Sequence, residues 1–398
     1  MKSIFLLILF LPTICLGQLI RSSEKVLDIN FNVDKIVSVQ DTAYILIHNK
    51  QTGVIKYDNP VGGGVESESF STILRPTWRS DIGLPENEAF FGIYNLLLYT
   101  IKYNYSEGWF EIKSYDLNSD DFDFKKSYKN EVYWLPIFVG DGTILLSDNM
   151  DTDGKFIQLL NSEMELVLKL ESSGYYRNVQ ITHDNAFYYL IADLVNIDRG
   201  KFNFIKVKKL NGNIIINKDF DLSINTVSCI KANGNVVACL GEGTINLIDN
   251  SGNLLWVNEE FILPRQDFCF VDDYLYLTND KDLLVLSIED GAIIDKISLT
   301  EYYKENLTLK KKAENVINRV LFLEPFRNES VFLMMGQSEK GFHIDEKSKY
   351  NSQFFIINKS GVIEFQSELF SETTILLPKV KKRDLDLIIH NKIINYEE

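Results

Sequence analysis

One short run of oxygen-bearing side chains has a spacing that could bind a metal ion. Asn149, Asp151 and Asp153 alternate with other residues and are followed by Gly154. Alternating carboxylate and amide oxygens with a glycine at the sharp turn are what a calcium loop requires. The later acidic ligand is missing, because its positions hold isoleucine and leucine. The run is a weak candidate for calcium, and a plain hairpin turn rich in Asp and Gly is the favoured alternative.

Motifs for catalysis are scarce in the chain. It contains 4 His, and it has neither a His-x-Glu-x-x-His nor a Cys-x-x-Cys metal spacing. A Gly-x-Ser-x-Gly nucleophile elbow and a Cys-x-x-Cys-His haem attachment are also absent. A mechanism based on histidine therefore has little to draw on, and no catalytic residue is predicted.

Aromatic, arginine and acidic residues gather in segments predicted to be loops. Aromatic and arginine side chains are the usual anchors of protein interfaces, and aromatic rings also suit sugars. Each of these residues could instead pack its own loop. The predicted residues for binding a ligand or partner are Trp78, Arg79, Asp81, Tyr105, Trp109, Arg199, Phe342, His343 and Asp345.

A recurring turn and strand indicate the scaffold that holds these loops. The turn contains a glycine after Asn, Ser or Asp, and its clearest copies are at Gly212, Gly252, Gly291 and Gly361. The first two are 40 residues apart, and the next interval is 39. A period of about 40 residues built from short strands predicts four-stranded units in a β-propeller.

One copy also supports a family resemblance, since Trp256 follows Gly252 by four residues. With this spacing the chain resembles the quinoprotein-dehydrogenase-like (PQQ-like repeat) β-propeller family, over most of residues 24–398 and as degenerate, WD40-like repeats. The resemblance implies the fold. Through the envelope-assembly scaffolds of that family, it also implies a protein partner. PQQ is not expected as a cofactor, because the adjacent cysteines that the family's quinone enzymes often use are absent.

The strands predict an all-β, eight-bladed β-propeller, with seven blades as the alternative. A last blade made of three C-terminal strands would be closed by the N-terminal strand Val26–Phe31, which removes open edges from the ring. The other seven blades each need an outer strand, predicted over residues 65–70, 122–127, 164–170, 214–220, 254–261, 293–299 and 362–370.

The long connections are expected on one face of this ring. Residues 71–88 and 301–319 join one blade to the next, the latter as a short Lys-rich helix. Residues 194–201 and 337–351 join the second strand of a blade to the third. In antiparallel blades both kinds of connection emerge on the same side. Function tends to lie on such loops, although insertions can also simply be tolerated there.

Composition and the N-terminus limit the partners and the location. The net charge of −15 excludes nucleic acid and disfavours a purely electrostatic attraction to anionic membranes. Residues 1–17 have the pattern of a signal peptide: Lys2, the apolar run Ile4–Leu11, and small residues before Gln18. We therefore expect cleavage before Gln18, a secreted or periplasmic protein, a single propeller domain over 18–398, and no transmembrane segment.

Cleavage would leave three cysteines, Cys229, Cys239 and Cys269. The first two flank a predicted two-residue turn at Asn233-Gly234. This turn would place Cys229 opposite Ala238, which weakens a bridge between them. Small buried hydrophobic residues are the favoured interpretation.

The predicted function is an exported, non-enzymatic binding scaffold whose protein partner or other ligand docks on the face of the long loops. The alternative is an extracellular glycan hydrolase or lyase. Such an enzyme would need two carboxylates converging at the channel mouth, and the available loop acids are Asp81, Asp198 and Asp345.

Overall fold

The structure, a computed structural model, describes 22 segments of the 398-residue chain. They are residues 20–26, 35–39, 43–49, 68–74, 79–80, 88–116, 123–131, 134–148, 156–171, 176–194, 201–224, 226–241, 243–259, 268–278, 282–299, 316–326, 330–339, 350–367, 370–373, 379–380, 385–389 and 392–397.

The elements with described bounds are β-strands, and each sheet is antiparallel. The described strands form eight sheets, seven of four strands and one of five. In seven of the sheets neighbouring strands are consecutive in the chain, except that the fifth strand of the five-stranded sheet pairs with that sheet's third strand. These are β2 (Lys35–Val39), β3 (Ala43–Asn49), β4 (Glu68–Leu74) and β5 (Arg79–Ser80); β6 (Ala89–Tyr94), β7 (Leu97–Asn104), β8 (Trp109–Asp116) and β9 (Asp123–Glu131); β10 (Trp134–Phe138), β11 (Ile144–Asp148), β12 (Phe156–Leu160) and β13 (Leu166–Glu171); β14 (Tyr176–His183), β15 (Phe187–Leu194), β16 (Lys201–Lys208) and β17 (Ile214–Asp221); β18 (Cys229–Asn233), β19 (Val236–Gly241), β20 (Thr244–Asp249) and β21 (Leu254–Asn258); β22 (Phe268–Val271), β23 (Tyr274–Thr278), β24 (Asp282–Ser287) and β25 (Ile293–Ser298); and β26 (Val316–Phe326), β27 (Ser330–Glu339), β28 (Tyr350–Asn358), β29 (Ile363–Gln366) and β30 (Phe370–Thr373).

The remaining sheet combines both ends of the described chain. Its order is β1 (Ile20–Val26), β33 (Lys392–Glu397), β32 (Leu385–Ile389) and β31 (Lys379–Val380). The register places Ile20 opposite Glu397 and Val26 opposite Lys392. A segment near the start of the chain thus forms the edge of a sheet whose other strands come last.

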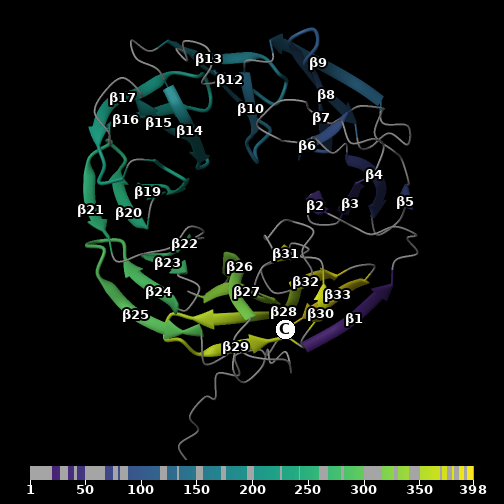
Figure 1. Cartoon of the computed structure of the whole chain (residues 1–398), viewed down its shortest axis with the longest axis vertical. Helices are drawn as coiled ribbons and strands as arrows, with labels where there is room; N and C mark the ends of the chain where they lie inside the picture. Colours follow the sequence, from purple (N-terminus) through teal and green to yellow (C-terminus); the bar gives the residue numbers. More distant parts are fainter. Residues whose placement is uncertain are drawn as a thin grey trace, which may run out of the picture.

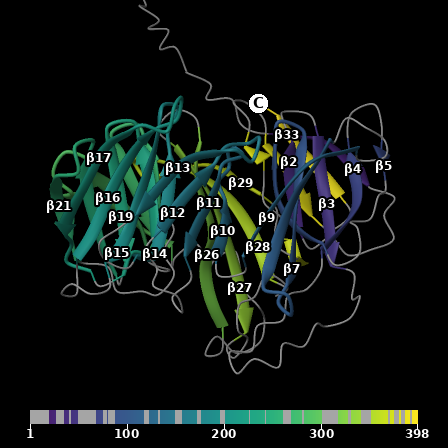
Figure 2. The same cartoon turned by 90° about the horizontal axis from the view of Figure 1, so that it is seen from above.

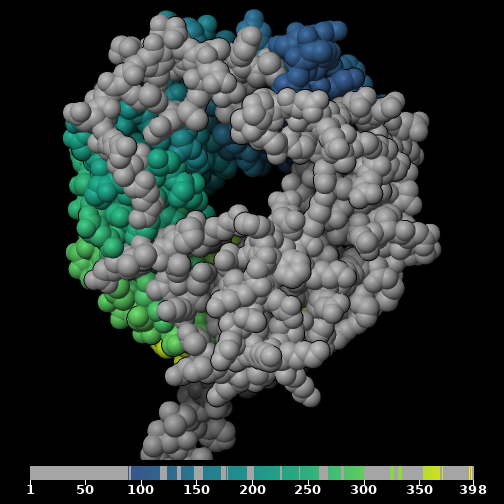
Figure 3. All heavy atoms as spheres, in the orientation of Figure 1, coloured from purple at the N-terminus to yellow at the C-terminus, as the bar shows by residue number. Residues whose placement is uncertain are grey.

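The sheets are arranged around a central opening (Figure 1). The first strand of each consecutive sheet, such as β14 or β18, lies toward the opening, and the last strand, such as β17 or β21, lies at the rim. Inner strands of neighbouring sheets contact one another, as β14 and β18 do. In the space-filling view, teal-coloured atoms border the opening (Figure 3). Four-stranded antiparallel sheets placed in this way define a β-propeller-like fold.

The recurring glycines form the tight turns between the third and fourth strands, as predicted. Gly212, Gly252, Gly291 and Gly361 have φ values of 67°, 75°, 72° and 74°. Side chains other than Gly avoid this region. A Cβ atom added to Gly291 would lie 2.6 Å from the Trp256 ring, in the sheet before it. Glycine therefore allows both the turn and the close packing of adjacent sheets.

The hydrophobic core consists of layers between neighbouring sheets. One layer joins Leu159 and Leu168 to Leu190 and Ile205. Further layers lie between the next pairs of sheets along the chain. Middle strands are buried on both faces, as in β20, because each sheet is covered on both sides.

Two strands differ in position from the sequence predictions. The N-terminal strand is β1, at Ile20–Val26 rather than Val26–Phe31, because pairing with β33 selects it among several possible segments. Residues 65–70, predicted as an outer strand, overlap β4, which is the third strand of its sheet. The outer strand is β5, whose two residues are too few to show a pattern in the sequence.

Three predicted loops are shorter than expected. Within residues 71–88, β4 continues to Leu74 and β5 occupies Arg79–Ser80, so these residues belong to the sheet and not to a connection between sheets. β26 begins at Val316 and β27 continues to Glu339, so part of each predicted loop belongs to a strand. These two strands extend beyond the other sheets at the lower side of Figure 2. The Lys-rich helix expected over residues 301–319 lies, before Val316, outside the described residues. Across the described part of the chain, no helix is long and apolar enough to cross a membrane.

The hairpin around the cysteines also has a different register. Asn233 pairs with Val236, so the two turn residues are Gly234 and Asn235, and Cys229 lies opposite Leu240 rather than Ala238. Cys239 and Cys269 are buried, and none of the three described cysteines is in a disulfide. For Cys239 and Cys269 the interpretation as small buried residues is confirmed.

Candidate functional site

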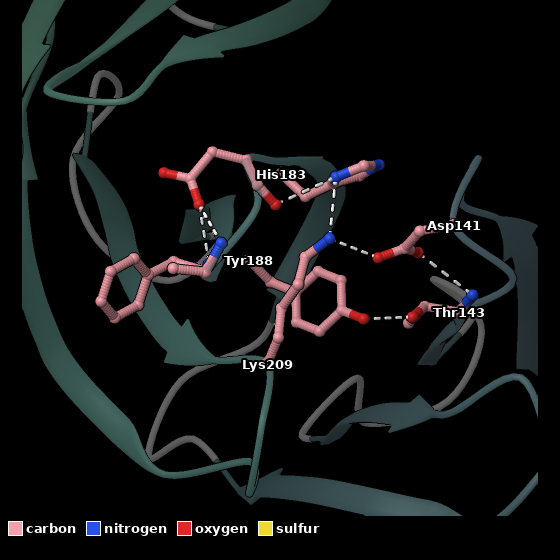
Figure 4. A network of polar contacts seen from close by, with 8 residues as sticks. Asp141, Thr143, His183, Tyr188 and Lys209 are labelled. Carbon is pink, nitrogen blue, oxygen red and sulfur yellow. Dashed lines mark hydrogen bonds and ion pairs between the residues drawn. The ribbon is translucent and has the colours of Figure 1, made fainter.

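A cluster of polar side chains connects the sheet β10–β13 with the sheet β14–β17. Asp141 lies in the β10–β11 turn, and Thr143 follows it before β11. His183 ends β14, Tyr188 lies in β15, and Lys209 lies in the β16–β17 turn. Figure 4 shows these five side chains pointing toward one another. We call them the turn cluster. All of its turns are tight, so it lies on the face opposite the long connections.

Lys209 is at the centre of the turn cluster. Its Nζ lies 2.5 Å from Asp141 Oδ2 and 2.9 Å from His183 Nδ1 (Figure 4). It also lies 4.8 Å from the centroid of the Tyr188 ring. The Tyr188 and Thr143 hydroxyls are hydrogen-bonded. His183 Nδ1 also lies 3.3 Å from the backbone carbonyl oxygen of Asp184, and the tautomer of the ring decides which of its two contacts is a hydrogen bond.

The electrostatics of the turn cluster follow from this geometry. Burial alone would raise the pKa of Asp141. The hydrogen bond from Lys209 and the nearby charges of His183 and Lys209 outweigh it and hold the pKa below its usual value. Burial raises the pKa of Tyr188, so its hydroxyl stays protonated. The turn cluster holds two sheets together, because its hydrogen bonds join turns of one sheet to turns of the other.

A second polar group is built around a buried carboxylate at Glu88, which is 2% exposed. Thr100 and Tyr115 donate to Oε2 at 2.6 and 2.9 Å, and Lys113 donates to Oε1 at 2.5 Å. Burial alone would lower the pKa of Lys113, but the hydrogen bond and charge of Glu88 raise it. Because both oxygens are satisfied, this group stabilises its sheet.

Two of the predicted binding residues lie at the β7–β8 turn, Tyr105 within it and Trp109 as the first residue of β8, and we call this part of the chain the aromatic turn. Tyr105 is 48% exposed and stacks on Tyr103, with centroids 5.4 Å apart. Trp109 donates through Nε1 to Glu107 at 2.6 Å and lies under the Lys129 ammonium, 3.7 Å from the ring centroid. The turn joins the second and third strands, so it lies on the face expected to bind.

The other predicted site residues are not brought together by the described structure. Arg79 lies in β5, on an outer strand rather than in a loop. The remaining ones lie outside the described residues: Trp78, Asp81, Arg199, Phe342, His343 and Asp345, the calcium candidates Asn149, Asp151 and Asp153, and the loop acid Asp198. The calcium site therefore stays a prediction, and nothing in the described residues favours the glycan enzyme.

The turn cluster was missed by reasoning from the sequence, although a signal for it exists. Asp141 and His183 are 42 residues apart, close to the repeat period. Residues one period apart occupy equivalent turns of neighbouring sheets, which brings them close. Lys209 comes from the other tight turn of the second sheet, and only the packing of the sheets places it between them.

Comparisons with known proteins give the following similarities. No protein-family model and no curated protein matches the chain. BamB from Moraxella catarrhalis has a TM-score of 0.47 at 10% identity, covering 96% of this chain and 98% of that one. Apo AztD from Citrobacter koseri has a TM-score of 0.47 at 11% identity, covering 92% of this chain and 89% of that one. Hsv2 from Kluyveromyces lactis has a TM-score of 0.46 at 11% identity, covering 86% of this chain and 98% of that one. Membership of the PQQ-like repeat family stays a resemblance.

Proposed function

We propose that the protein is an exported, non-enzymatic scaffold that binds a partner protein on the face of its long connections. The observation that carries the proposal is the aromatic turn. It presents Tyr105 half-exposed at a place where Tyr103, Trp109 and Lys129 hold the surroundings in fixed contacts. An exposed aromatic ring on a rigid support binds with little loss of conformational entropy, which is what an interface anchor needs.

The scaffold in this proposal is an eight-bladed propeller closed by its N-terminal strand. The pairing of β1 with β33 supports this, because it joins an early and a late segment in one sheet. Closure of this kind leaves no gap in the ring. A closed ring holds its loops in fixed positions, so residues from several blades can form one surface.

Export is the second part of the proposal and rests on residues 1–17. Expression in a bacterial host with an intact secretion pathway, followed by intact-mass measurement of the protein in the periplasm or medium, tests it. We expect a chain that begins at Gln18. A full-length chain confined to the cytoplasm would contradict export.

Binding is tested by capture from envelope extract and culture fluid with purified protein and two variants. Tyr105→Ala combined with Trp109→Ala removes the anchor of the aromatic turn. Phe124→Ala is the matched control, because Phe124 is an aromatic residue of the same sheet, is 56% exposed, and lies at the opposite end of the strands. We expect a partner retained by the wild type and the control and lost by the double variant. Equal capture by all three would rule out this face.

A further inference from the structure

The outer strands of the sheets differ in whether they carry charged residues, which affects whether a strand can pair with another chain. A terminal strand offers unpaired backbone groups to other chains, and charged residues, especially lysine, protect it from pairing. Six terminal strands have described side chains, and five of them carry charge. The charged residues are Asp123, Lys125, Lys126, Lys129 and Glu131 in β9; Lys169 and Glu171 in β13; Lys218, Asp219 and Asp221 in β17; Asp295 and Lys296 in β25; and Glu364 in β29.

β21 is the exception among these six strands. Its sequence, Leu254–Asn258, contains no charged residue. Leu254 and Leu255 are 43% and 48% exposed, whereas Trp256 is turned inward and donates through Nε1 to the carbonyl oxygen of Ile288 at 2.8 Å. β21 is the last strand of its sheet and lies at the outer rim (Figure 1). β21 is thus an apolar strand edge without the charged side chains that the other five strands carry, although it shares with β13, β17, β25 and β29 an irregular register against its partner strand.

We infer that β21 pairs with β21 of a second copy of this chain, antiparallel about a two-fold axis near Trp256. In that register Leu254 lies opposite Asn258 of the second copy, and Leu255 lies opposite its Val257. No like charges meet along the strand. The edge groups of both strands gain hydrogen-bond partners, as in strand addition.

Charge complementarity at the ends of the strand favours a second copy as the occupant. The same register places Glu259, which is exposed, opposite Asn253 of the second copy. The ammonium group of Lys218 is held 2.8 Å from Asn253 Oδ1 within each chain. Each Glu259 therefore meets the Lys218 of the other copy, twice by symmetry. A net charge of −15 opposes association of two copies in general, and the opposite charges at the two ends of this contact act against that repulsion.

Sedimentation equilibrium from micromolar to near-millimolar concentration tests the inference. The wild type is expected to dimerise reversibly. Leu255→Lys, which restores the protection seen on other edges, is expected to raise the dimer Kd by at least about tenfold. Ile215→Lys is the matched control, since Ile215 is 52% exposed and lies on β17, which already carries Lys218. It should dimerise like the wild type.

A charge exchange tests the register. Glu259→Lys places lysine against Lys218 twice and is expected to weaken the dimer by about tenfold. Adding Lys218→Glu to it reverses both charges and should restore the dimer. A wild type that stays monomeric throughout the range, equal dimerisation of Leu255→Lys and Ile215→Lys, or failure of the exchange to restore association would each overturn the inference. Circular dichroism confirms that every variant is folded.

Discussion

Lys209 brings together residues from three turns and two sheets, and its contacts make the turn cluster the best-defined polar group in the described structure. Asp141 and Lys209 are 17% and 18% exposed, so water screens their 2.5 Å ion pair less than it screens pairs at the surface. His183 Nδ1 lies 2.9 Å from the same ammonium group and adds a second polar contact. We therefore expect this group to contribute to the stability of the junction between the two sheets.

Asp141→Asn is expected to lower the free energy of unfolding by about 1 kcal/mol at neutral pH. The pKa of Asp141 is lowered in the folded state. Its contribution is therefore present above the unfolded value of about 3.8 and is lost as pH falls through the lower folded value. Urea unfolding at neutral and at successively more acid pH should show the two proteins converging in acid.

Asp221→Asn is the control for this experiment. Asp221 also lies 2.5 Å from a lysine, Lys201, but it is 70% exposed. Its replacement is expected to change stability by less than about 0.5 kcal/mol. Equal losses for both variants would show that burial does not distinguish the two pairs.

Met164 occupies a turn position that glycine holds in other sheets. Its φ is 56°, and Asn161 Oδ1 accepts from the backbone of Glu163 and Glu165, as Asn358 Oδ1 does from Ser360 and Val362 around Gly361. Met164 is nonetheless 5% exposed and packs with Tyr99 of the preceding sheet. The packing of its side chain thus compensates for an unfavourable backbone conformation.

Replacing Met164 should reveal both effects. Met164→Ala loses the packing and keeps the backbone strain, at a cost of about 2 kcal/mol or more. Met164→Gly loses the same packing but relieves the strain, so it should be more stable than the alanine variant by about 1 kcal/mol. Thermal unfolding of the three proteins measures the order Met, Gly, Ala. An alanine variant more stable than the glycine variant would contradict this account of the turn.

At the scale of the elements, the turn between the third and fourth strands acts as a spacer between sheets. Gly252 lies against Phe204, Gly291 against Trp256 and Gly361 against Ile297, each in the preceding sheet. The spacing of Trp256 after Gly252 therefore has a structural meaning. The tryptophan covers the glycine turn of the next sheet and donates to that turn at Ile288.

A double-mutant cycle on Trp256 and Gly291 measures this contact. Gly291→Ala alone should cost about 2–4 kcal/mol, because the new methyl group meets the indole ring and the backbone has positive φ. In a Trp256→Leu background the same change should cost only about 1 kcal/mol, the backbone part. The difference between the two unfolding free energies is the coupling. If the effects of the two substitutions were additive, the Trp256 ring and the Gly291 turn would not interact.

At the scale of the whole molecule, the pairing of β1 with β33 joins the two ends of the described chain. In the closed ring that we propose, each sheet is supported by two neighbours, so a sheet that lost its edge strand would weaken the contacts on both sides. The pairing brings β1 beside β33, near the C-terminus (Figure 1).

Removal of residues 1–26 tests the role of this pairing. Compared with a chain beginning at Gln18, the shorter chain is expected to unfold at a temperature lower by at least about 5 °C. Amide exchange should become faster in β33, which loses its partner, and much less so in β20, which lies in another sheet. Unchanged exchange in β33 would show that β1 does not protect it.

Much of the fold was predictable because its signals are local. The glycine turns, the short apolar strands and the period near 40 residues each depend on a few neighbouring residues, so they predicted an all-β propeller and four turns that the structure confirms. The predicted strand positions were wrong where pairing with another strand determines which residues form the strand. The two residues of β5 and the segment chosen for β1 have no local pattern that distinguishes them.

The candidate sites also divide into features that the local sequence predicts and features that depend on packing between sheets. The sequence determined that Tyr105 and Trp109 flank one turn, because a hairpin brings together residues that are close along the chain. Only the tertiary structure decided that Asp141, His183 and Lys209 meet, and that β21 is an uncharged edge among charged ones. Those facts depend on how separate sheets pack side by side. Contacts between sheets join residues that are far apart along the chain, and their separation in the sequence is not sufficient to predict which of them meet.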